Sequence, residues 1–84
     1  MDAHQQYEHQ ILNAIDGSES LSQRSLASSL GIALGLTNLL VRRLVRKGWV
    51  RVTRIKANRV GYFLTPAGVA EKARLSRLSL QHAI

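Results

Sequence analysis

The chain has 84 residues, a length that holds one compact domain and buries only just enough apolar surface to fold by itself. It contains no cysteine, which excludes disulfides, thiolate metal sites and cysteine nucleophiles. Its 12 lysines and arginines outnumber 5 acidic residues and give a formal net charge of +7, an excess typical of proteins that bind polyanions.

Apolar spacing predicts two helices near the start of the chain. The first covers about residues 4–16 and has apolar residues spaced by three and four: Tyr7, Ile11, Leu12 and Ile15. Ser22 then stands at an N-cap position, and a second helix over about 22–30 ends at Gly31. Ser25 replaces the glutamate that would complete a capping box with Ser22, so we expect an incomplete box.

A third helix is predicted over about residues 34–47. Its apolar residues recur at core-compatible spacing, and Gly48 supplies the stop. The turn that separates it from the second helix is short and contains glycine, as a helix-turn-helix requires.

The hydrophobic period changes after Gly48. Valines alternate with polar residues, and residues 60–64 are rich in strand formers, which predicts a two-stranded hairpin over about 49–64 with a basic tip. Thr65 and Pro66 then begin a final helix over about 66–82, because threonine can cap a helix and proline suits its first position.

These elements predict a mainly α (α+β) fold. We expect residues 1–84 to form a single winged helix-turn-helix domain, with a three-helix core, a two-stranded β-hairpin wing and a C-terminal helix.

The charged residues are unevenly placed along the chain. No aspartate or glutamate lies between Ser20 and Ala70, yet this segment holds nine cations: Arg24, Arg42, Arg43, Arg46, Lys47, Arg51, Arg54, Lys56 and Arg59. Such a block is expected of a surface that faces a polyanion, and a solvated basic face is the alternative.

Several short motifs lie within about residues 21–75: Leu21-Ser22-Gln23-Arg24, Leu26-Ala27, Leu30-Gly31-Ile32, Asn38, Leu44, Lys47-Gly48-Trp49-Val50 and Leu64-Thr65-Pro66-Ala67-Gly68. Together they resemble the signature of MarR-like winged-helix regulators, nearest those associated with exopolysaccharide loci. The resemblance implies a transcriptional regulator that binds double-stranded DNA in a sequence-specific way. Its recognition helix, about 34–47, would enter the major groove, and the wing tip, 56–59, would reach the backbone or the minor groove.

Twelve residues are candidates for contact with DNA. The amide of Asn38 suits adenine, clustered arginines suit phosphates or guanine, and Arg59 suits a narrow minor groove. Local capping, simple solvation and protection of a strand edge are the alternatives for these residues. The candidates are Ser22, Arg24, Leu34, Asn38, Leu39, Arg42, Arg43, Arg46, Arg54, Lys56, Asn58 and Arg59.

The expected reading surface is unusually apolar. Leu34, Leu36 and Leu39 lie on it, and Ala33 replaces the usual serine or threonine cap. Three interpretations of these leucines stay open. They could contact thymine methyl groups, pack inward in a shifted register, or form a face that binds another protein. Two alternative functions therefore stay open: a winged-helix protein interaction module, and the N-terminal DNA-binding part of a larger regulator or enzyme.

Catalysis and metal binding have little support in the sequence. His4, His9 and His82 lie near the ends at spacings unsuited to one metal site, and phosphate loops and nucleophile motifs are absent. We expect no enzyme activity, no metal and no cofactor. Trp49 and Tyr62 are interpreted as core residues rather than as platforms on which bases stack.

Helix-turn-helix proteins usually bind two half-sites as dimers, so a homodimer through the terminal helices is expected. Its candidate interface residues are Tyr7, Ile11, Leu75, Leu78, Leu80 and Ile84, with intramolecular packing as the alternative. The polar start and the charged residues between apolar stretches predict no membrane segment, and a cytoplasmic location fits the lack of cysteine.

Overall fold

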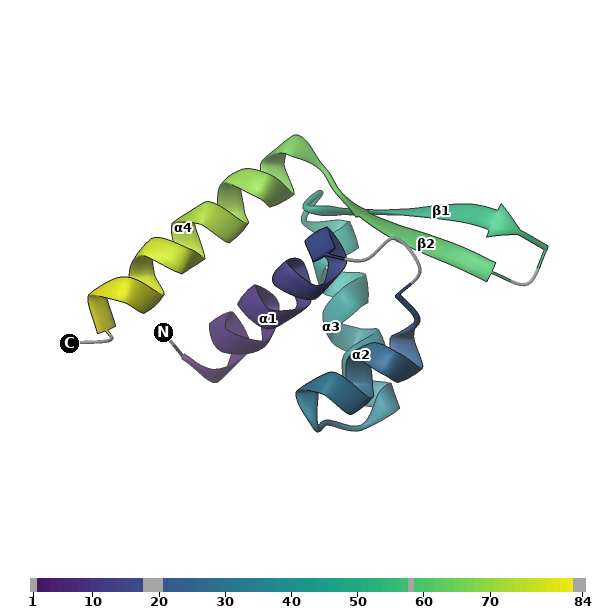
Figure 1. Cartoon of the computed structure of the whole chain (residues 1–84), viewed down its shortest axis with the longest axis horizontal. Helices are drawn as coiled ribbons and strands as arrows, with labels where there is room; N and C mark the ends of the chain where they lie inside the picture. Colours follow the sequence, from purple (N-terminus) through teal and green to yellow (C-terminus); the bar gives the residue numbers. More distant parts are fainter. Residues whose placement is uncertain (1, 18–20, 58, 83–84) are drawn as a thin grey trace.

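The computed structural model describes residues 2–17, 21–57 and 59–82, and it confirms the predicted winged helix-turn-helix architecture (Figure 1). Its elements are α1 (Ala3–Gly17), α2 (Gln23–Leu30), α3 (Leu34–Arg46), β1 (Val50–Lys56), β2 (Arg59–Leu64) and α4 (Pro66–His82). Every helix begins and ends within one residue of the range expected from the sequence.

One core holds the three N-terminal helices, the base of the wing and α4 together. It contains Ile11, Leu12 and Ile15 of α1, Leu26 of α2, Leu40, Val41 and Leu44 of α3, Val50 and Tyr62 of the strands, and Leu75 of α4. Trp49 is half-buried against this cluster, and Tyr62 is buried within it. Both aromatic rings therefore pack in the core, as predicted.

The helix-turn-helix is formed by α2 and α3, which meet at 109°. Gly31 ends α2 with φ of 67°, a left-handed conformation that glycine adopts at little steric cost. The expectation of an incomplete capping box was wrong: the Ser22 side chain accepts from the Ser25 amide, and the Ser25 hydroxyl accepts from the Ser22 amide, each at 3.1 Å. The short serine side chain thus replaces glutamate in this role.

The wing is an antiparallel hairpin that projects beyond the helices (Figure 1). Val50 pairs with Leu64 at its base and Thr53 with Gly61 further out, and the register is irregular between Arg54 and Lys56. Every residue of β1 after Val50 is exposed, and in β2 only Gly61 and Tyr62 are buried, so the outer part of the wing is exposed.

The junction between the wing and α4 gives a physical reason for the Leu-Thr-Pro-x-Gly motif. Thr65 Oγ1 donates to the Gly48 carbonyl at 2.6 Å and accepts from the Gly68 amide at 3.0 Å. A Cβ on Gly68 would lie 2.0 Å from the Trp49 carbonyl oxygen. Glycine is therefore required where α4 meets the start of β1.

Ion pairs link α1 to the end of α3 and to α4, where Lys72 donates to Asp16 at 2.6 Å, and a third pair lies within α4. Lys47, after the end of α3, donates to the buried Glu8 of α1 at 3.0 Å, and its ammonium lies 4.6 Å from the centre of the Trp49 ring. Glu71 accepts two hydrogen bonds from Arg74, which hold the pKa of Glu71 below its ordinary value against the opposing effect of burial.

The six residues predicted for an interface between two copies of the chain differ in their exposure. Ile11 and Leu75 have no exposed surface, so their assignment to an interface was wrong: the apolar faces of α1 and α4 cover each other here. Tyr7 and Leu78 are half-buried against the same core, Leu80 is 71% exposed, and Ile84 lies outside the described residues.

Gly68→Ala is expected to destabilise the fold by at least about 2 kcal/mol, because the added Cβ forces α4 away from the Trp49 backbone. The midpoint of thermal unfolding, followed by circular dichroism, should fall by roughly 10 °C. Gly17→Ala is the matched control, since no described atom lies within 4 Å of its added Cβ. Equal midpoints for the two variants would contradict the close contact.

Glu71→Gln tests the ion pair through its pH dependence. Because the pKa of Glu71 is lowered in the folded state, its carboxylate stabilises the fold above the unfolded pKa of about 4.3, and this contribution is lost as pH falls through the lowered folded pKa. Urea unfolding between pH 2.5 and 7 should show wild type more stable at neutral pH, with the difference shrinking on acidification. A constant difference over this range would show that the pair does not act through the carboxylate charge.

Candidate nucleic-acid interface

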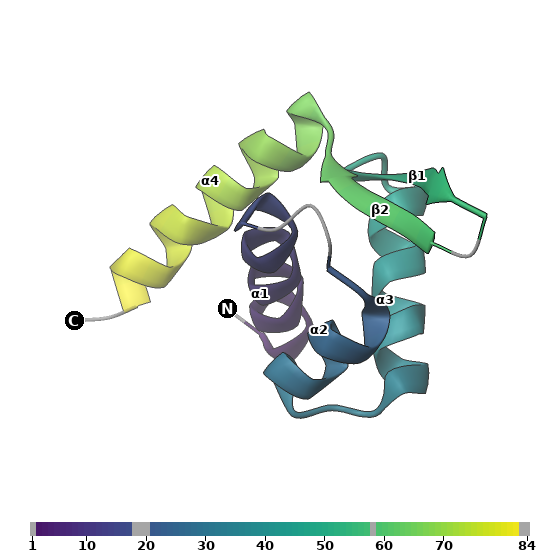
Figure 2. The same cartoon turned by 45° about the vertical axis from the view of Figure 1, so that its right-hand side comes forward.

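The orientation of α3 is fixed by the face that it buries. Thr37, Leu40, Val41 and Leu44 point into the core, and the threonine hydroxyl donates to the Ala33 carbonyl at 3.0 Å. The opposite face is left exposed at the free edge of the molecule (Figure 2). Gly35, Leu39, Arg42 and Arg46, all exposed, follow one another on it at helical spacing; we call these four residues the α3 ridge.

The other predicted residues of α3 lie beside this ridge. Leu34 is 43% exposed, and Asn38 and Arg43 are half-buried on its two flanks. As expected from the sequence, Ala33 is the N-cap residue and makes no side-chain capping bond.

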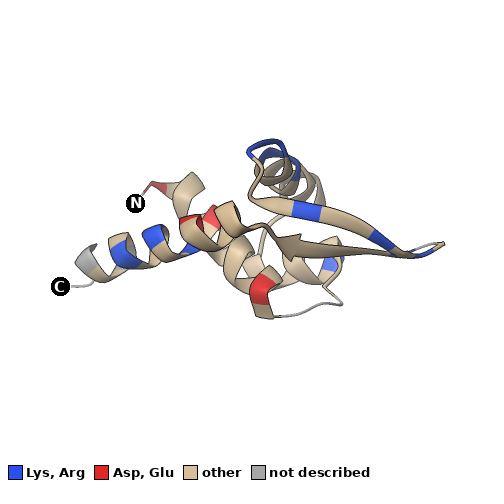
Figure 3. Ribbon diagram, turned by 90° about the horizontal axis from the view of Figure 1, so that it is seen from above, with Lys and Arg blue, Asp and Glu red and all other residues tan. Residues whose placement is uncertain are grey.

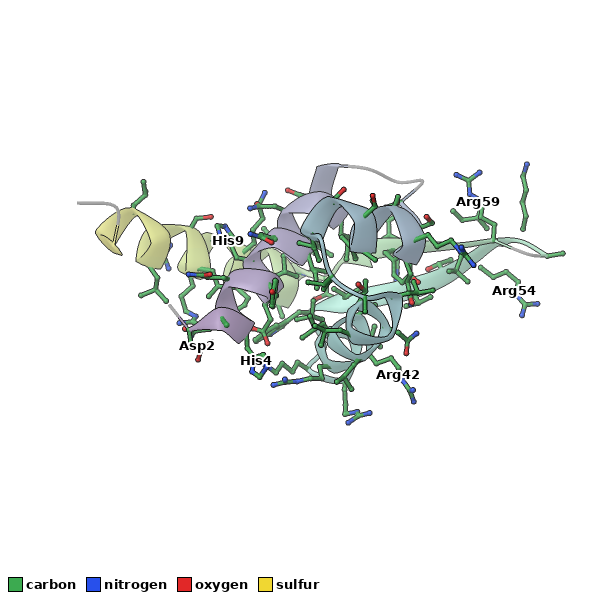
Figure 4. The ribbon with its side chains drawn as sticks, turned by 90° about the horizontal axis from the view of Figure 1, so that it is seen from below. Asp2, His4, His9, Arg42, Arg54 and Arg59 are labelled. Carbon is green, nitrogen blue, oxygen red and sulfur yellow. The ribbon has the colours of Figure 1, made fainter. Side chains whose placement is uncertain are left out.

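The wing carries a second group of cations. Arg54, Lys56 and Arg59 are exposed, and Figure 4 shows Arg54 and Arg59 extending from the outer part of the wing while Arg42 extends from α3. Arg51, nearer the base, lies over the Phe63 ring at 5.7 Å. Asn58 lies outside the described residues.

Acidic residues are confined to one part of the described chain. The wing, α2 and α3 carry only cations, whereas the acidic residues of the described chain lie on or next to α1 and α4 (Figure 3). Three of these acids, Glu8, Asp16 and Glu71, pair with Lys47, Lys72 and Arg74 respectively. Within the part of the chain that the structure describes, no arginine of α3 or the wing has a carboxylate within 4.0 Å. Their charges are therefore free to act on a ligand.

A hollow of about 380 Å³ lies where α2, the start of α3 and the wing converge. It brings together four of the predicted contact residues, Ser22, Arg24, Leu34 and Arg59, which come from three different elements. The remaining lining residues are Leu21, Gln23, Val60 and Tyr62.

A chain of hydrogen bonds fixes the amide of Asn38. Asn38 Nδ2 donates to Gln23 Oε1 at 3.0 Å, and Gln23 Nε2 donates to Tyr62 Oη at 3.0 Å. A carboxamide has two N–H donors and one carbonyl acceptor, so this bond leaves Asn38 the donor and acceptor that adenine requires. Gln23 was missed as a functional candidate, although it lies inside the Leu21-Ser22-Gln23-Arg24 motif.

No metal site or membrane-spanning helix is found in residues 2–17, 21–57 and 59–82. No three histidine, aspartate or glutamate side chains there could hold a metal ion, and His9 Nε2 is hydrogen-bonded to Ser76 Oγ at 3.0 Å. No single helix there is long and apolar enough to cross a membrane; the one helix pair that passes by combined composition is α2 with α3, bent by 109°.

Comparison with known proteins gives one family match. Residues 5–51, more than half of the chain, match the model of a family described as winged helix-turn-helix DNA-binding. No curated protein sequence matches significantly.

Solved structures share the fold. The oxidised form of MarR from E. coli is 30% identical, with a TM-score of 0.72 over 84% of this chain and 52% of that one. The PcaV transcriptional regulator of Streptomyces coelicolor is 26% identical, with a TM-score of 0.73 over 83% and 53%. A variant of Staphylococcus aureus MepR bound to an oligodeoxyribonucleotide is 19% identical, with a TM-score of 0.77 over 98% and 60%. The chain thus spans little more than half the length of these proteins.

Tyr62→Phe tests the hydrogen-bond chain. It keeps the buried ring but removes the acceptor for Gln23, so it should cost about 0.5–1.5 kcal/mol in urea unfolding and shift the NMR signals of the Asn38 side-chain amide. Tyr7→Phe is the control, because the Tyr7 hydroxyl has no hydrogen-bond partner in the described residues, and it should leave those signals in place. Unchanged Asn38 signals in Tyr62→Phe would mean that the amide is held by something else.

Proposed function

The chain belongs to the winged helix-turn-helix DNA-binding family, and from this we propose that it is the DNA-reading part of a transcriptional regulator that recognises a specific duplex sequence. The observation that carries the proposal is the uncovered outer face of α3, whose arginines, like those of the wing, have no neutralising acid among the described residues.

In the proposed complex α3 lies in the major groove, which is wide enough to admit a helix. Arg42 and Arg46 of the α3 ridge contact phosphates or guanine, Arg43 contacts phosphate at its flank, and Asn38 reads adenine. The chain of hydrogen bonds through Gln23 supports the role of Asn38, because it holds the amide before DNA arrives.

The remaining contacts come from the start of α2 and from the wing. Ser22 and Arg24 lie at the N-terminus of α2, where free amides and positive charge suit a phosphate. Arg54, Lys56 and Arg59 extend from the wing toward the backbone or the minor groove, and Asn58 is assigned to the same tip from the sequence alone.

We further propose that the protein acts as a homodimer in the cytoplasm, bound to two half-sites about 34 Å apart. The terminal helices supply the interface, with Leu80 as its most exposed apolar residue; Tyr7 and Leu78 contribute their accessible edges, and Ile84 is assigned from the sequence. The proposed activity is binding and needs no cofactor.

Salt dependence tests the proposal directly. Affinity for the duplex selected from a random library should fall steeply with salt, because bound cations release counterions from the phosphates at a log–log slope of about 0.9 per contact. Arg42→Ala should weaken binding to specific and unrelated duplexes alike and reduce the slope by about 1. Fluorescence anisotropy at several salt concentrations measures both quantities.

Arg77→Ala is the matched control, since it removes the same charge from α4, whose C-terminal half lies at the end of the molecule away from the wing tip (Figure 1). It should leave the slope unchanged. A slope near zero for wild type, or equal losses in the two variants, would contradict the proposed interface.

A further inference from the structure

The centre of the α3 ridge is apolar. Leu39 is 55% exposed there, Leu36 on one flank of α3 is 37% exposed and Leu34 at the start of the helix is 43% exposed, so these leucines do not pack inward in a shifted register. Leu39 lies one turn from Arg42, in the middle of a surface that otherwise suits a polyanion. An apolar side chain in that place suits an apolar group within a charged ligand.

Gly35 lies one turn before Leu39 on the same ridge. Its φ is not positive, and a Cβ at this position would meet no atom within 4 Å. Neither the backbone nor the packing of the protein therefore requires glycine, although glycine is less favourable than alanine inside a helix. Close approach of a partner to the helix backbone would account for glycine here, because glycine leaves the backbone uncovered.

We infer that Gly35 and Leu39 together read thymine methyl groups in the major groove. The 5-methyl group of thymine is the apolar group that base edges present in that groove, and it suits contact with an aliphatic side chain. Leu39 supplies this contact, and the missing side chain of Gly35 lets the base pair approach α3. The inference rests on the proposed function and assigns a base to one part of its site.

The neighbours of Leu39 favour DNA over a protein partner. Arg42 and Arg46 continue the same ridge without acidic partners in the described chain, and Asn38, the next residue in sequence, holds an oriented amide suited to adenine. Because Asn38 suits adenine and its neighbour Leu39 suits thymine, we expect adjoining A·T pairs in each half-site.

The test begins with duplexes selected by wild type from a random library, in which single thymines are then replaced by deoxyuridine. This replacement removes only the methyl group. Wild type should lose about fourfold in affinity at one or two positions, as expected for exposing one methyl-sized group, and nothing at the others. Leu39→Ala should bind thymine and deoxyuridine duplexes equally, whereas Arg77→Ala should keep the wild-type difference.

Gly35→Ala provides a second readout with opposite signs. Its midpoint of thermal unfolding should rise, because alanine favours the helix and the new Cβ has open space. Its affinity for the selected duplex should fall roughly tenfold, because the same Cβ meets the base pair. A merely structural glycine would not stabilise the protein and weaken its complex at once.

Three results would overturn the inference. Equal binding of thymine and deoxyuridine duplexes at every position, with the salt dependence retained, would contradict thymine-methyl recognition by Gly35 and Leu39. The proposed function would still hold. Unchanged DNA affinity in both Leu39→Ala and Gly35→Ala would assign the exposed Leu34, Leu36 and Leu39 to contact with a protein partner instead. Absence of salt-dependent duplex binding by wild type would remove both proposals together.

Discussion

The rotation of α3 about its own axis is the constraint on which the candidate interface depends. Four buried residues set it, and the one polar member, Thr37, satisfies its hydroxyl on the backbone one turn earlier. Because a helix repeats every 3.6 residues, burying this face places Gly35, Leu39, Arg42 and Arg46 on the opposite side. The core therefore determines which residues α3 presents on its outer face, and so which of them the proposed complex places against DNA.

The cations that stabilise the fold are different residues from those proposed to bind DNA. Lys47 follows α3 directly, yet it turns back to the buried Glu8 and covers Trp49, which makes it part of the fold. A carboxylate this buried requires a cation, since leaving it unpaired would be costly. Arg42 and Arg46, a short distance along the same helix, have no such partner among the described residues and keep their charge available.

The sequence predicted the helices and the hairpin well because periodicity and capping residues are local signals. It did not predict the link from Tyr62 through Gln23 to Asn38, because these residues meet only after α2, α3 and the wing have packed together. Ile11 and Leu75 were misassigned since an apolar helix face does not reveal which element covers it. Ser25 completes its capping box because its hydroxyl accepts from the Ser22 amide, whereas the usual sequence pattern has a glutamate at this position. The DNA contacts themselves stay predictions, because they depend on a ligand outside the chain.

The shallow anchoring of the wing has an evolutionary consequence. Burial ends at Val50 in β1 and at Gly61 in β2, so the part of the hairpin beyond Gly61 contributes little to the free energy of unfolding. Substitutions near Arg54 and Lys56 can alter charge and reach without disturbing the core, and surface changes of this kind are usually tolerated. In the proposed interface, the outer part of the hairpin can thus diverge among descendants of this protein at little cost to folding, whereas α3 must change under the restraint of the core that packs behind it.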